Sequence, residues 1–324
     1  MKNPFLYRDR PYPLKLIVDI HSYCNARCTM CPYPKYTRRQ TQGKMPWPLY
    51  EDIVNELAAI GRDHRFRPLL TYCYMGEPFL AEDLDRYVSF ALERNIEVYL
   101  NTNASVMTPP KVDALLAAGF KGKIHISFHG ISPEVYERIT GLDYQTTLRH
   151  TLYLIEKYPP GNILIRGVDD RWPPGEKQKW SDFWRAKQVQ LEYLPPISRC
   201  GALSRLLPDR LKHAKTRRLF GCRENLPLVE MVILFDGRAV MCCEDMGREM
   251  IWGDVGRDGL LGVWNGSRRR AVVTKLYNGK SLPGDFLCYR CEMALGAAGL
   301  VKSIARAAWH KCKSHNRKSR AAAL

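Results

Sequence analysis

The sequence predicts an α/β protein whose N-terminal part forms a parallel sheet covered by helices. Short apolar runs alternate with amphipathic stretches between residues 14 and 194. This alternation is typical of parallel strands joined by right-handed helical crossovers. After residue 195 the alternation stops, and two short runs separated by a turn predict a smaller α+β unit at the C-terminal end. The pattern alone leaves an open doubly wound sheet and a barrel as alternatives.

Each element is expected from its local pattern. The stretch 47–61 predicts a helix because Ile53, Leu57 and Ile60 recur on one face. The stretch 132–141 begins as helices do, with a serine at the N-cap and a proline in the first turn. The expected strands are 14–20, 69–75, 96–102, 123–128, 162–168 and 189–194. The expected helices are 47–61, 82–95, 109–119 and 132–141.

The rest of the chain is organised differently. Residues 232–245 predict a hairpin with Asp236 and Gly237 at its turn. The proline- and arginine-rich segment before the hairpin predicts a linker. The expected divisions are a sheet domain over 1–195, a linker over 196–221, a cysteine-containing domain over 222–300 and a basic tail over 301–324.

Composition restricts the class of protein. Of the 324 residues, 45% are apolar, yet no run of about 18 apolar residues exists to span a membrane. The N-terminal residues do not resemble a secretory signal, so we expect a cytoplasmic protein without membrane contact. Eleven cysteines in that compartment indicate metal ligation or chemistry rather than disulfides. The net charge of +17 suits an anionic partner, and nucleic acid is a less favoured one.

Three cysteines follow the first expected strand in the segment HSYCNARCTMCPYP. Cys24, Cys28 and Cys31 are close enough in sequence for their thiolates to share one metal centre. A structural zinc site or an ordinary iron–sulfur site closes with four protein ligands. The loop after a strand of a parallel sheet opens at the ligand-binding end. The residues alone leave two alternatives: a fourth ligand lies elsewhere in the chain, as a structural zinc site would need, or one metal position stays open.

The C-x3-C-x2-C pattern after a first strand resembles the radical S-adenosylmethionine (SAM) superfamily. The resemblance covers residues 14–194 and implies a partial (β/α)6 TIM-like barrel. It implies that the three cysteines hold a 4Fe–4S cluster whose fourth iron binds the amino and carboxylate groups of SAM. Reductive cleavage of SAM then generates a 5′-deoxyadenosyl radical that abstracts hydrogen from the substrate.

Further matches follow successive strands and imply contacts with SAM. The segment YMGEP is similar to the Gly-Gly-Glu motif of the family, so Gly76 and Glu77 are expected at the SAM ammonium group. Asn103 ends the third strand in NTNA, and Ser127 in ISFHG is expected at the ribose. Arg166 on the fifth strand is expected to face the SAM carboxylate.

A second cysteine set, Cys222, Cys242, Cys243, Cys288 and Cys291, has the order Cys … Gly-x4-Cys-Cys-x-Asp … Cys-x2-Cys. This order resembles the SPASM and twitch auxiliary-cluster domains. The resemblance implies that a second 4Fe–4S cluster is held by Cys222, Cys242, Cys288 and Cys291, with zinc as the alternative. Adjacent residues on a strand point to opposite faces, so only one of Cys242 and Cys243 is expected to be a ligand. The cysteines after Cys291 are too few for a full SPASM pattern, which favours the shorter twitch type.

These features predict a radical SAM oxidoreductase that dehydrogenates a small polar substrate of the sugar or aminocyclitol type. The auxiliary cluster is expected to accept the second electron, and a flavodoxin or ferredoxin to supply the first. Residues considered for the proton acceptor, without a choice among them, are His129, Asp169, Asp170, Arg171 and Glu192.

Three alternatives remain at this point. The first is modification of a ribosomal peptide. The second is epimerisation of a sugar or peptide, with Cys243 as the hydrogen-atom donor, although a small buried side chain is the simpler interpretation of this cysteine. The third is a non-catalytic protein that is stabilised by a bound metal and binds nucleic acid. This alternative accounts for the net positive charge but not for the motifs that follow the strands.

Overall fold

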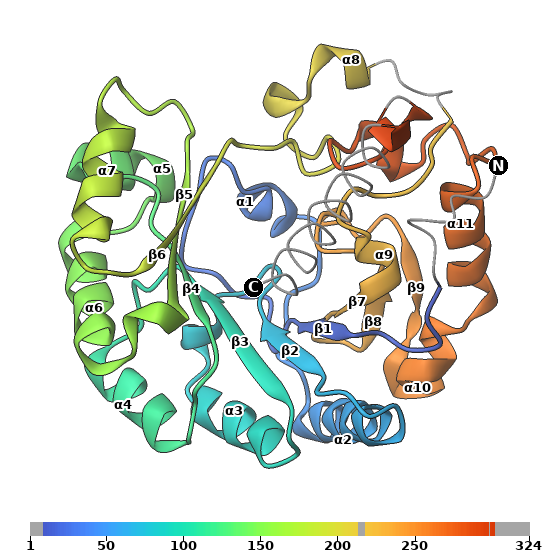
Figure 1. Ribbon diagram of the computed structural model, residues 1–324, viewed down its shortest axis with the longest axis horizontal. Helices are drawn as coiled ribbons and strands as arrows, with labels where there is room; N and C mark the ends of the chain where they lie inside the picture. The colour runs from blue at the N-terminus through green and yellow to red at the C-terminus, as the bar shows by residue number, and fades with distance from the viewer. Residues whose placement is uncertain (1–8, 213–217, 298, 302–324) are drawn as a thin grey trace, which may run out of the picture.

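The structure is a computed structural model and describes residues 9–212, 218–297 and 299–301. One curved sheet of nine strands organises the chain, in the order β6-β5-β4-β3-β2-β1-β7-β8-β9 (Figure 1). The strands are β1 (Lys15–Val18), β2 (Leu69–Tyr72), β3 (Glu97–Thr102), β4 (Ile124–Ser127), β5 (Ile163–Val168), β6 (Gln190–Leu194), β7 (Glu230–Ile233), β8 (Arg238–Val240) and β9 (Ile251–Asp254).

Helices connect and cover these strands. The helices are α1 (Tyr33–Tyr36), α2 (Trp47–Asp63), α3 (Leu84–Leu92), α4 (Pro109–Ala117), α5 (Pro133–Thr140), α6 (Tyr144–Lys157), α7 (Glu176–Arg185), α8 (Asp209–Lys212), α9 (Leu226–Val229), α10 (Val255–Trp264) and α11 (Ser267–Tyr277). Short 3-10 turns are η1 (Pro78–Leu80), η2 (Pro160–Asn162), η3 (Ser204–Leu206) and η4 (Leu287–Arg290).

All six predicted parallel strands are present and pair in sequence order. Strands β1 to β6 are parallel neighbours, and helices α2, α3, α4, α6 and α7 line the outside of the arc in Figure 1. The sheet does not close, because β6 and β9 are its two edges. The chain therefore has the partial-barrel arrangement that the family resemblance implied. The pattern analysis did not anticipate α6, α7, α10 or α11.

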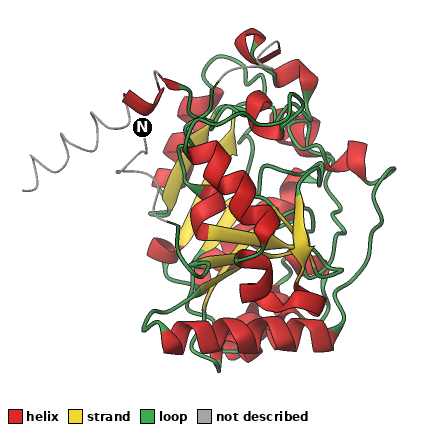
Figure 2. Cartoon of the chain, turned by 90° about the vertical axis from the view of Figure 1, so that its right-hand side faces the viewer, coloured by secondary structure: helices red, strands yellow, loops and turns green. Residues whose placement is uncertain are grey.

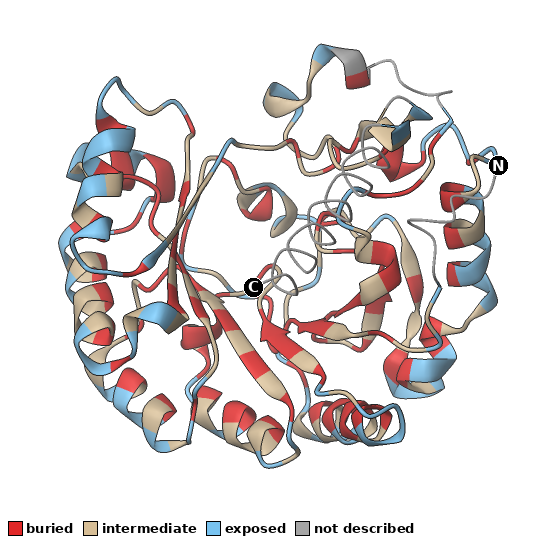
Figure 3. Ribbon diagram, in the orientation of Figure 1, coloured by how far each residue is buried: buried red, intermediate tan, exposed pale blue. Residues whose placement is uncertain are grey.

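Burial follows from strand geometry. In β3 the residues alternate between half-buried and buried, and Val98, Leu100 and Thr102 are on the buried side. Successive strand side chains point to opposite faces, so the buried set packs against the surrounding helices. Figure 3 shows the same division in the outer helices, whose buried residues face the sheet. In Figure 2 the strands lie between helices and loops.

The C-terminal part continues the same sheet. Strand β7 pairs in parallel with β1, with Leu16 opposite Met231, and the antiparallel strands β8 and β9 extend the edge. The predicted hairpin is present as β7 and β8, with Gly237 at its turn in the left-handed region at φ +86°. Of the predicted basic tail, residues 302–324 lie outside the described part of the chain.

A contact between helices α2 and α10 connects the part of the chain with the six parallel strands to the C-terminal part. Helix α10 is interrupted at Gly259, whose φ of +68° is outside the helical region. The two amides after this break donate to the carboxylate of Glu56 on α2, Leu260 at 2.7 Å and Leu261 at 3.0 Å. Glu56 thus caps the second half of α10, as a capping residue satisfies amides that lack helical partners.

Candidate metal centres

The loop with the first three predicted ligands lies at the carboxyl end of β1. Cys24, Cys28 and Cys31 occupy the segment between β1 and α1, near the centre of Figure 1. Two backbone amides of this loop donate to the last carbonyls of α5, each at 2.8 Å. The amide of Cys31 also donates to the carbonyl of Cys28 at 3.0 Å. The loop is therefore held on the barrel independently of a metal.

The three thiols influence one another's ionisation. Burial raises the pKa of Cys24 to about 12, and burial and neighbouring thiols also raise the pKa of Cys28. Such thiols lose their protons when a metal supplies positive charge. The amide of Tyr33 donates to Sγ of Cys31 at 3.5 Å, and Nδ2 of Asn103 lies 3.9 Å from Sγ of Cys24. Within the described residues, no three His, Cys, Asp or Glu side chains surround one point as a single metal ion requires.

Gly76 and Glu77 lie against the cysteine loop, directly after β2. A Cβ on Gly76 would stand 2.0 Å from the carbonyl oxygen of His21, so this crossing of two loops requires glycine. The buried carboxylate of Glu77 accepts hydrogen bonds from the amide of Asn103 at 2.7 Å and from the hydroxyl of Thr102. Burial raises the pKa of Glu77 to about 7, although these donors oppose the rise. Its contact with SAM stays a prediction.

Ser127 and Arg166 lie side by side across the sheet. Ser127 is opposite Arg166 in the register of β4 and β5, and Arg166 is opposite Glu192 of β6. Nε of Arg166 donates to Oε2 of Glu192 at 2.5 Å. The guanidinium of Arg166, which was predicted to bind the SAM carboxylate, is therefore already paired with a carboxylate of the chain itself. An incoming carboxylate must share or replace that partner.

His129, one of the residues considered for the proton acceptor, is buried and neutral. Its Nδ1 accepts a hydrogen bond from the amide of Val168 at 3.2 Å, which places the ring proton on Nε2. Burial, with the positive charges of Arg166 and Arg199, lowers the pKa of His129 to about 4. The imidazole therefore carries no charge near pH 7.

Other residues considered for the proton acceptor have structural partners. The buried carboxylate of Asp170 accepts two hydrogen bonds from Arg205, at 3.0 and 2.6 Å, and one from the hydroxyl of Thr29 in the cysteine loop. Asp169 accepts from the amide of Trp172 at 2.9 Å and from a tyrosine hydroxyl of β6. Glu192 pairs with arginine, as described above. These contacts fix loops at the carboxyl end of the sheet.

The four predicted auxiliary ligands line one cavity. Cys222, Cys242, Cys288 and Cys291 are buried and line one narrow cavity between the end of β8, turn η4 and the segment before α9. The amide of Met293 donates to Sγ of Cys291 at 3.4 Å. These residues come from three separate segments, and the fold alone brings them together.

A fifth cysteine lines the same cavity. Cys200 is 4% exposed and comes from the segment between β6 and η3. Sequence spacing gave no signal for this placement, because Cys200 precedes the auxiliary motif in a stretch interpreted as a linker. Ten cysteines lie within the described residues, and none of them forms a disulfide.

The adjacent cysteines after β8 diverge, although they lie beyond the hairpin strand on which the sequence placed them. Cys242 belongs to the main core and lines the auxiliary cavity, whereas Cys243 packs on a small apolar cluster shared by β1, β7 and β8. Strand β8 ends at Val240, so both cysteines lie just beyond it. Burial raises the pKa of Cys243 well above its ordinary value. Its thiol is therefore protonated.

An ion pair that sequence reasoning missed lies between the two cysteine sets. Nη1 of Arg199 is 2.8 Å from Oε1 of Glu244, and Arg199 interacts electrostatically with the thiols of Cys31 and Cys243. The other carboxylate oxygen of Glu244 is buried and accepts no hydrogen bond among the described residues. Arg199 and Glu244 belong to two distant segments, and no sequence motif connects them. Only the fold therefore reveals the pair.

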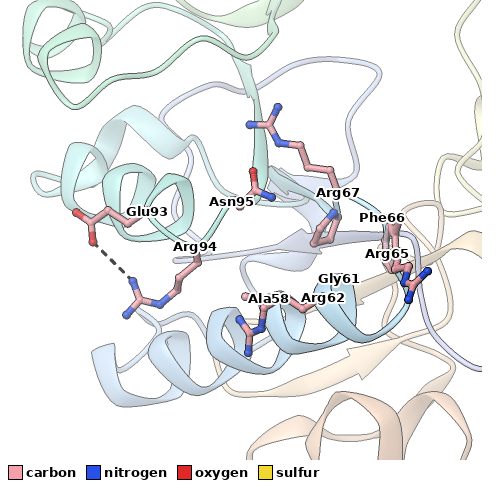
Figure 4. Close-up of a pocket in the computed structure, with 10 residues that line it drawn as sticks. Ala58, Gly61, Arg62, Arg65, Phe66, Arg67, Glu93, Arg94 and Asn95 are labelled. Atoms are coloured by element: carbon pink, nitrogen blue, oxygen red, sulfur yellow. Dashed lines mark ion pairs between the residues drawn. The ribbon is translucent and has the colours of Figure 1, made fainter.

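A separate hollow lies at the other end of the strands. It is lined by arginines that precede β2 and β3, among them Arg62, Arg65, Arg67 and Arg94 (Figure 4). In Figure 4 these side chains point in different directions, and Arg94 pairs with Glu93. This basic hollow shares no lining residue with the auxiliary cavity or with the first cysteine loop, so it is not part of the candidate centres.

Comparison with known proteins agrees with both centres. The model of the radical SAM superfamily matches residues 18–171. The model of an iron–sulfur cluster-binding domain, SPASM, matches residues 222–292. The two matched ranges contain the first and the second cysteine sets respectively. No helix in the described part of the chain is both long and apolar enough to cross a membrane.

Individual relatives cover most of the chain at low identity. The S-adenosyl-L-methionine-dependent 2-deoxy-scyllo-inosamine dehydrogenase of Niallia circulans is 21% identical over 85% of this chain and 91% of its own length. The structure of BtrN in complex with AdoMet and 2-DOIA has a TM-score of 0.58 at 19% identity, over 90% of this chain and 95% of that one. Streptococcus suis SuiB bound to precursor peptide SuiA has a TM-score of 0.66 at 16% identity, over 91% and 71%.

Proposed function

Because the chain belongs to the radical SAM superfamily and carries a SPASM-type domain, we propose that it dehydrogenates a small polar alcohol of the sugar or aminocyclitol type. The expected product is the corresponding ketone. The barrel domain over 1–195 and the auxiliary domain over 222–300 contribute one centre each, and the intervening segment contributes Arg199.

The thiols suit the two clusters that this family uses. Three cysteines at the first site leave one iron of a 4Fe–4S cluster without a protein ligand, as a catalytic centre requires. When bound, SAM and the two clusters supply a 5′-deoxyadenosyl radical and an acceptor for one electron. The proposed ligands are Cys24, Cys28 and Cys31 for the first cluster, and Cys222, Cys242, Cys288 and Cys291 for the second. The residues proposed to bind SAM are Gly76, Glu77, Asn103, Ser127 and Arg166.

The observation that carries the proposal is the position of the Arg199–Glu244 pair between the two cysteine sets. We assign Arg199 to orient a substrate hydroxyl by donating to its oxygen. We assign the free oxygen of Glu244 to accept the hydroxyl proton. The substrate then loses one hydrogen atom from carbon, one proton to Glu244 and one electron, which together oxidise an alcohol to a ketone.

The extent of similarity supports this substrate class. The dehydrogenase relative matches over 91% of its own length, whereas the PqqA peptide cyclase of Gluconobacter oxydans matches over 34% of its own length. A flavodoxin or ferredoxin is the proposed electron donor. The cytoplasm is the proposed location, since none of the described cysteines forms a disulfide.

Isotope transfer tests the proposal. The anaerobically loaded and reduced protein is given SAM and a panel of polyols and aminocyclitols, 2-deoxy-scyllo-inosamine included, deuterated at the carbinol carbons. Deuterium in 5′-deoxyadenosine together with a ketone product is the expected result. Deuterium transfer with an inverted alcohol would indicate an epimerase. Transfer only from a peptide would indicate a peptide modifier, and either outcome overturns the proposal.

A further inference from the structure

Five cysteines, rather than four, surround the auxiliary cavity. We propose that Cys200 is an iron ligand of the auxiliary site and competes with Cys222 for one position of the cluster. This inference rests on the auxiliary half of the proposed function, that is, on iron binding at the second site. It does not depend on the identity of the substrate or on SAM cleavage.

The contacts of Cys200 bring its thiol beside those of three predicted ligands. Its thiol hydrogen-bonds the thiol of Cys291 and interacts electrostatically with those of Cys242 and Cys288. Cys222 interacts electrostatically with Cys291 from another segment of the cavity wall. A 4Fe–4S cluster offers four irons to protein thiolates, so five thiols around one cavity exceed that number by one.

The backbone that carries Cys200 has an uncommon conformation. Arg199, Cys200 and Gly201 have φ values of +52°, +53° and +80°. The left-handed region is unfavourable for a residue other than glycine, and such strain persists only where surrounding contacts enforce it. Two consecutive residues other than glycine in this region turn the arginine toward the ion pair and the cysteine toward the cavity.

The contacts that enforce this turn come from the cysteine segments themselves. The amide of Ser198 donates to Oε1 of Glu292, the residue after Cys291, at 2.7 Å. On the other side, a Cβ on Gly201 would stand 3.3 Å from the side chain of Arg290, the residue before Cys291. The segment with Cys200 is thus fixed to both neighbours of a predicted ligand.

Glu244, the proposed proton acceptor, also lines this cavity. It is 8% exposed, yet its Oε2 has no hydrogen-bond partner among the described residues. A buried polar atom without a partner costs free energy unless a ligand or water satisfies it. This oxygen is the one assigned to the substrate hydroxyl, so the five thiols are the only side chains of the cavity that we propose as cluster ligands.

Iron content tests the competition without any catalytic readout. In a background with Cys24, Cys28 and Cys31 replaced by alanine, the anaerobically loaded chain is expected to hold about four irons. The single variants Cys200→Ser and Cys222→Ser are each expected to keep about four, because the other cysteine takes the shared position. The double variant is expected to lose the 4Fe–4S absorption and most of its iron. Cys73→Ser, which removes a thiol outside the cavity, is the control.

A second measurement does not require any change at Cys222. The variant Cys200→Ser alone keeps all four family cysteines, and we expect it to release auxiliary iron to a chelator several-fold faster than its parent and the Cys73→Ser control. Equal release rates overturn the inference, as does loss of the cluster in Cys222→Ser alone or its retention in the double variant. If the variant that lacks only Cys24, Cys28 and Cys31 loads no iron, the auxiliary cluster itself is refuted. This result differs from the outcomes that refute only the role of Cys200.

Discussion

Nη1 of Arg199 lies 2.8 Å from Oε1 of Glu244, and the second oxygen of the same carboxylate has no partner among the described residues. The arginine comes from the segment after β6 and the glutamate from the segment after β8. A paired oxygen fixes the orientation of the carboxylate, and the unpaired oxygen is the one available to a substrate.

Glu244→Gln tests the proposed proton acceptor. The amide oxygen can still accept from Arg199, but the side chain can no longer take a proton. We expect ketone formation to fall by roughly 10²–10⁴-fold, the usual contribution of a general base. Formation of 5′-deoxyadenosine should continue, since it precedes deprotonation. Glu249→Gln is the matched control, because Glu249 forms an exposed ion pair with Arg290. Unchanged ketone formation in Glu244→Gln would remove Glu244 from the reaction.

Gly76→Ala tests the crossing of two loops at the first centre. The new Cβ would meet the carbonyl of His21 at 2.0 Å, so the loop after β2 must move away from the cysteine loop. We expect SAM to bind at least about tenfold more weakly, which corresponds to about 1.4 kcal/mol, while the iron content stays unchanged. Equilibrium dialysis with labelled SAM measures the first quantity. Gly161→Ala, where nothing lies within 4 Å of the added methyl group, is the control.

Cys243→Ser separates dehydrogenation from epimerisation. Cys243 packs on an apolar cluster and its thiol is protonated, so the simplest expectation is a small effect. We expect ketone formation within about threefold of the unmodified protein and little change in the melting temperature, because serine is close to cysteine in size and its hydroxyl can keep the hydrogen bond of the thiol to Glu230. Loss of product with continued SAM cleavage would instead identify the thiol as a hydrogen-atom donor.

His129 makes stability depend on pH. Burial lowers the pKa of His129 to about 4, whereas an unfolded histidine titrates near 6.5. Between these values the unfolded chain binds more protons, so the free energy of unfolding falls as the pH decreases, by up to about 1.4 kcal/mol per pH unit. His129→Gln, whose amide can still accept from Val168, should reduce that slope between pH 6.5 and 5. Urea unfolding under anaerobic conditions measures it, and an equal slope would contradict the assignment.

The cap between α2 and α10 is expected to stabilise both parts of the chain. Glu56→Ala leaves two amides after Gly259 without their acceptor and should cost about 1–2 kcal/mol of unfolding free energy. Asp52→Ala on the same helix, at an exposed position, should cost little. Denaturant titration compares the two variants, and equal midpoints would show that the cap contributes nothing.

Much of this architecture could be predicted from the chain itself. The six parallel strands were predicted because apolar runs such as 96–102 have a local signal, with buried residues at alternate positions. Gly76 and the cysteine loop were identified because their motifs are contiguous in sequence. Helix α7 was missed because its apolar face is only two tryptophans, Trp180 and Trp184, within a polar stretch.

Features assembled from distant segments could not be predicted. Cys200 and Cys291 are separated by most of the auxiliary domain, and no periodicity connects them. The same is true of Arg199 with Glu244, since each residue alone resembles a surface charge. Arg166 was assigned to SAM without its partner, because Glu192 becomes its neighbour only through the register of β5 and β6.

The pairing of β1 with β7 has a consequence for how the protein can be made. Residues 15–18 acquire their second neighbour only after residues 230–233 have left the ribosome. Until then one side of the strand presents unpaired amides and carbonyls, which invite association with other chains. A gene fragment that encodes the barrel alone should therefore yield inclusion bodies. Co-expression of the C-terminal part, which contains β7, should restore the pairing and keep the fragment in solution.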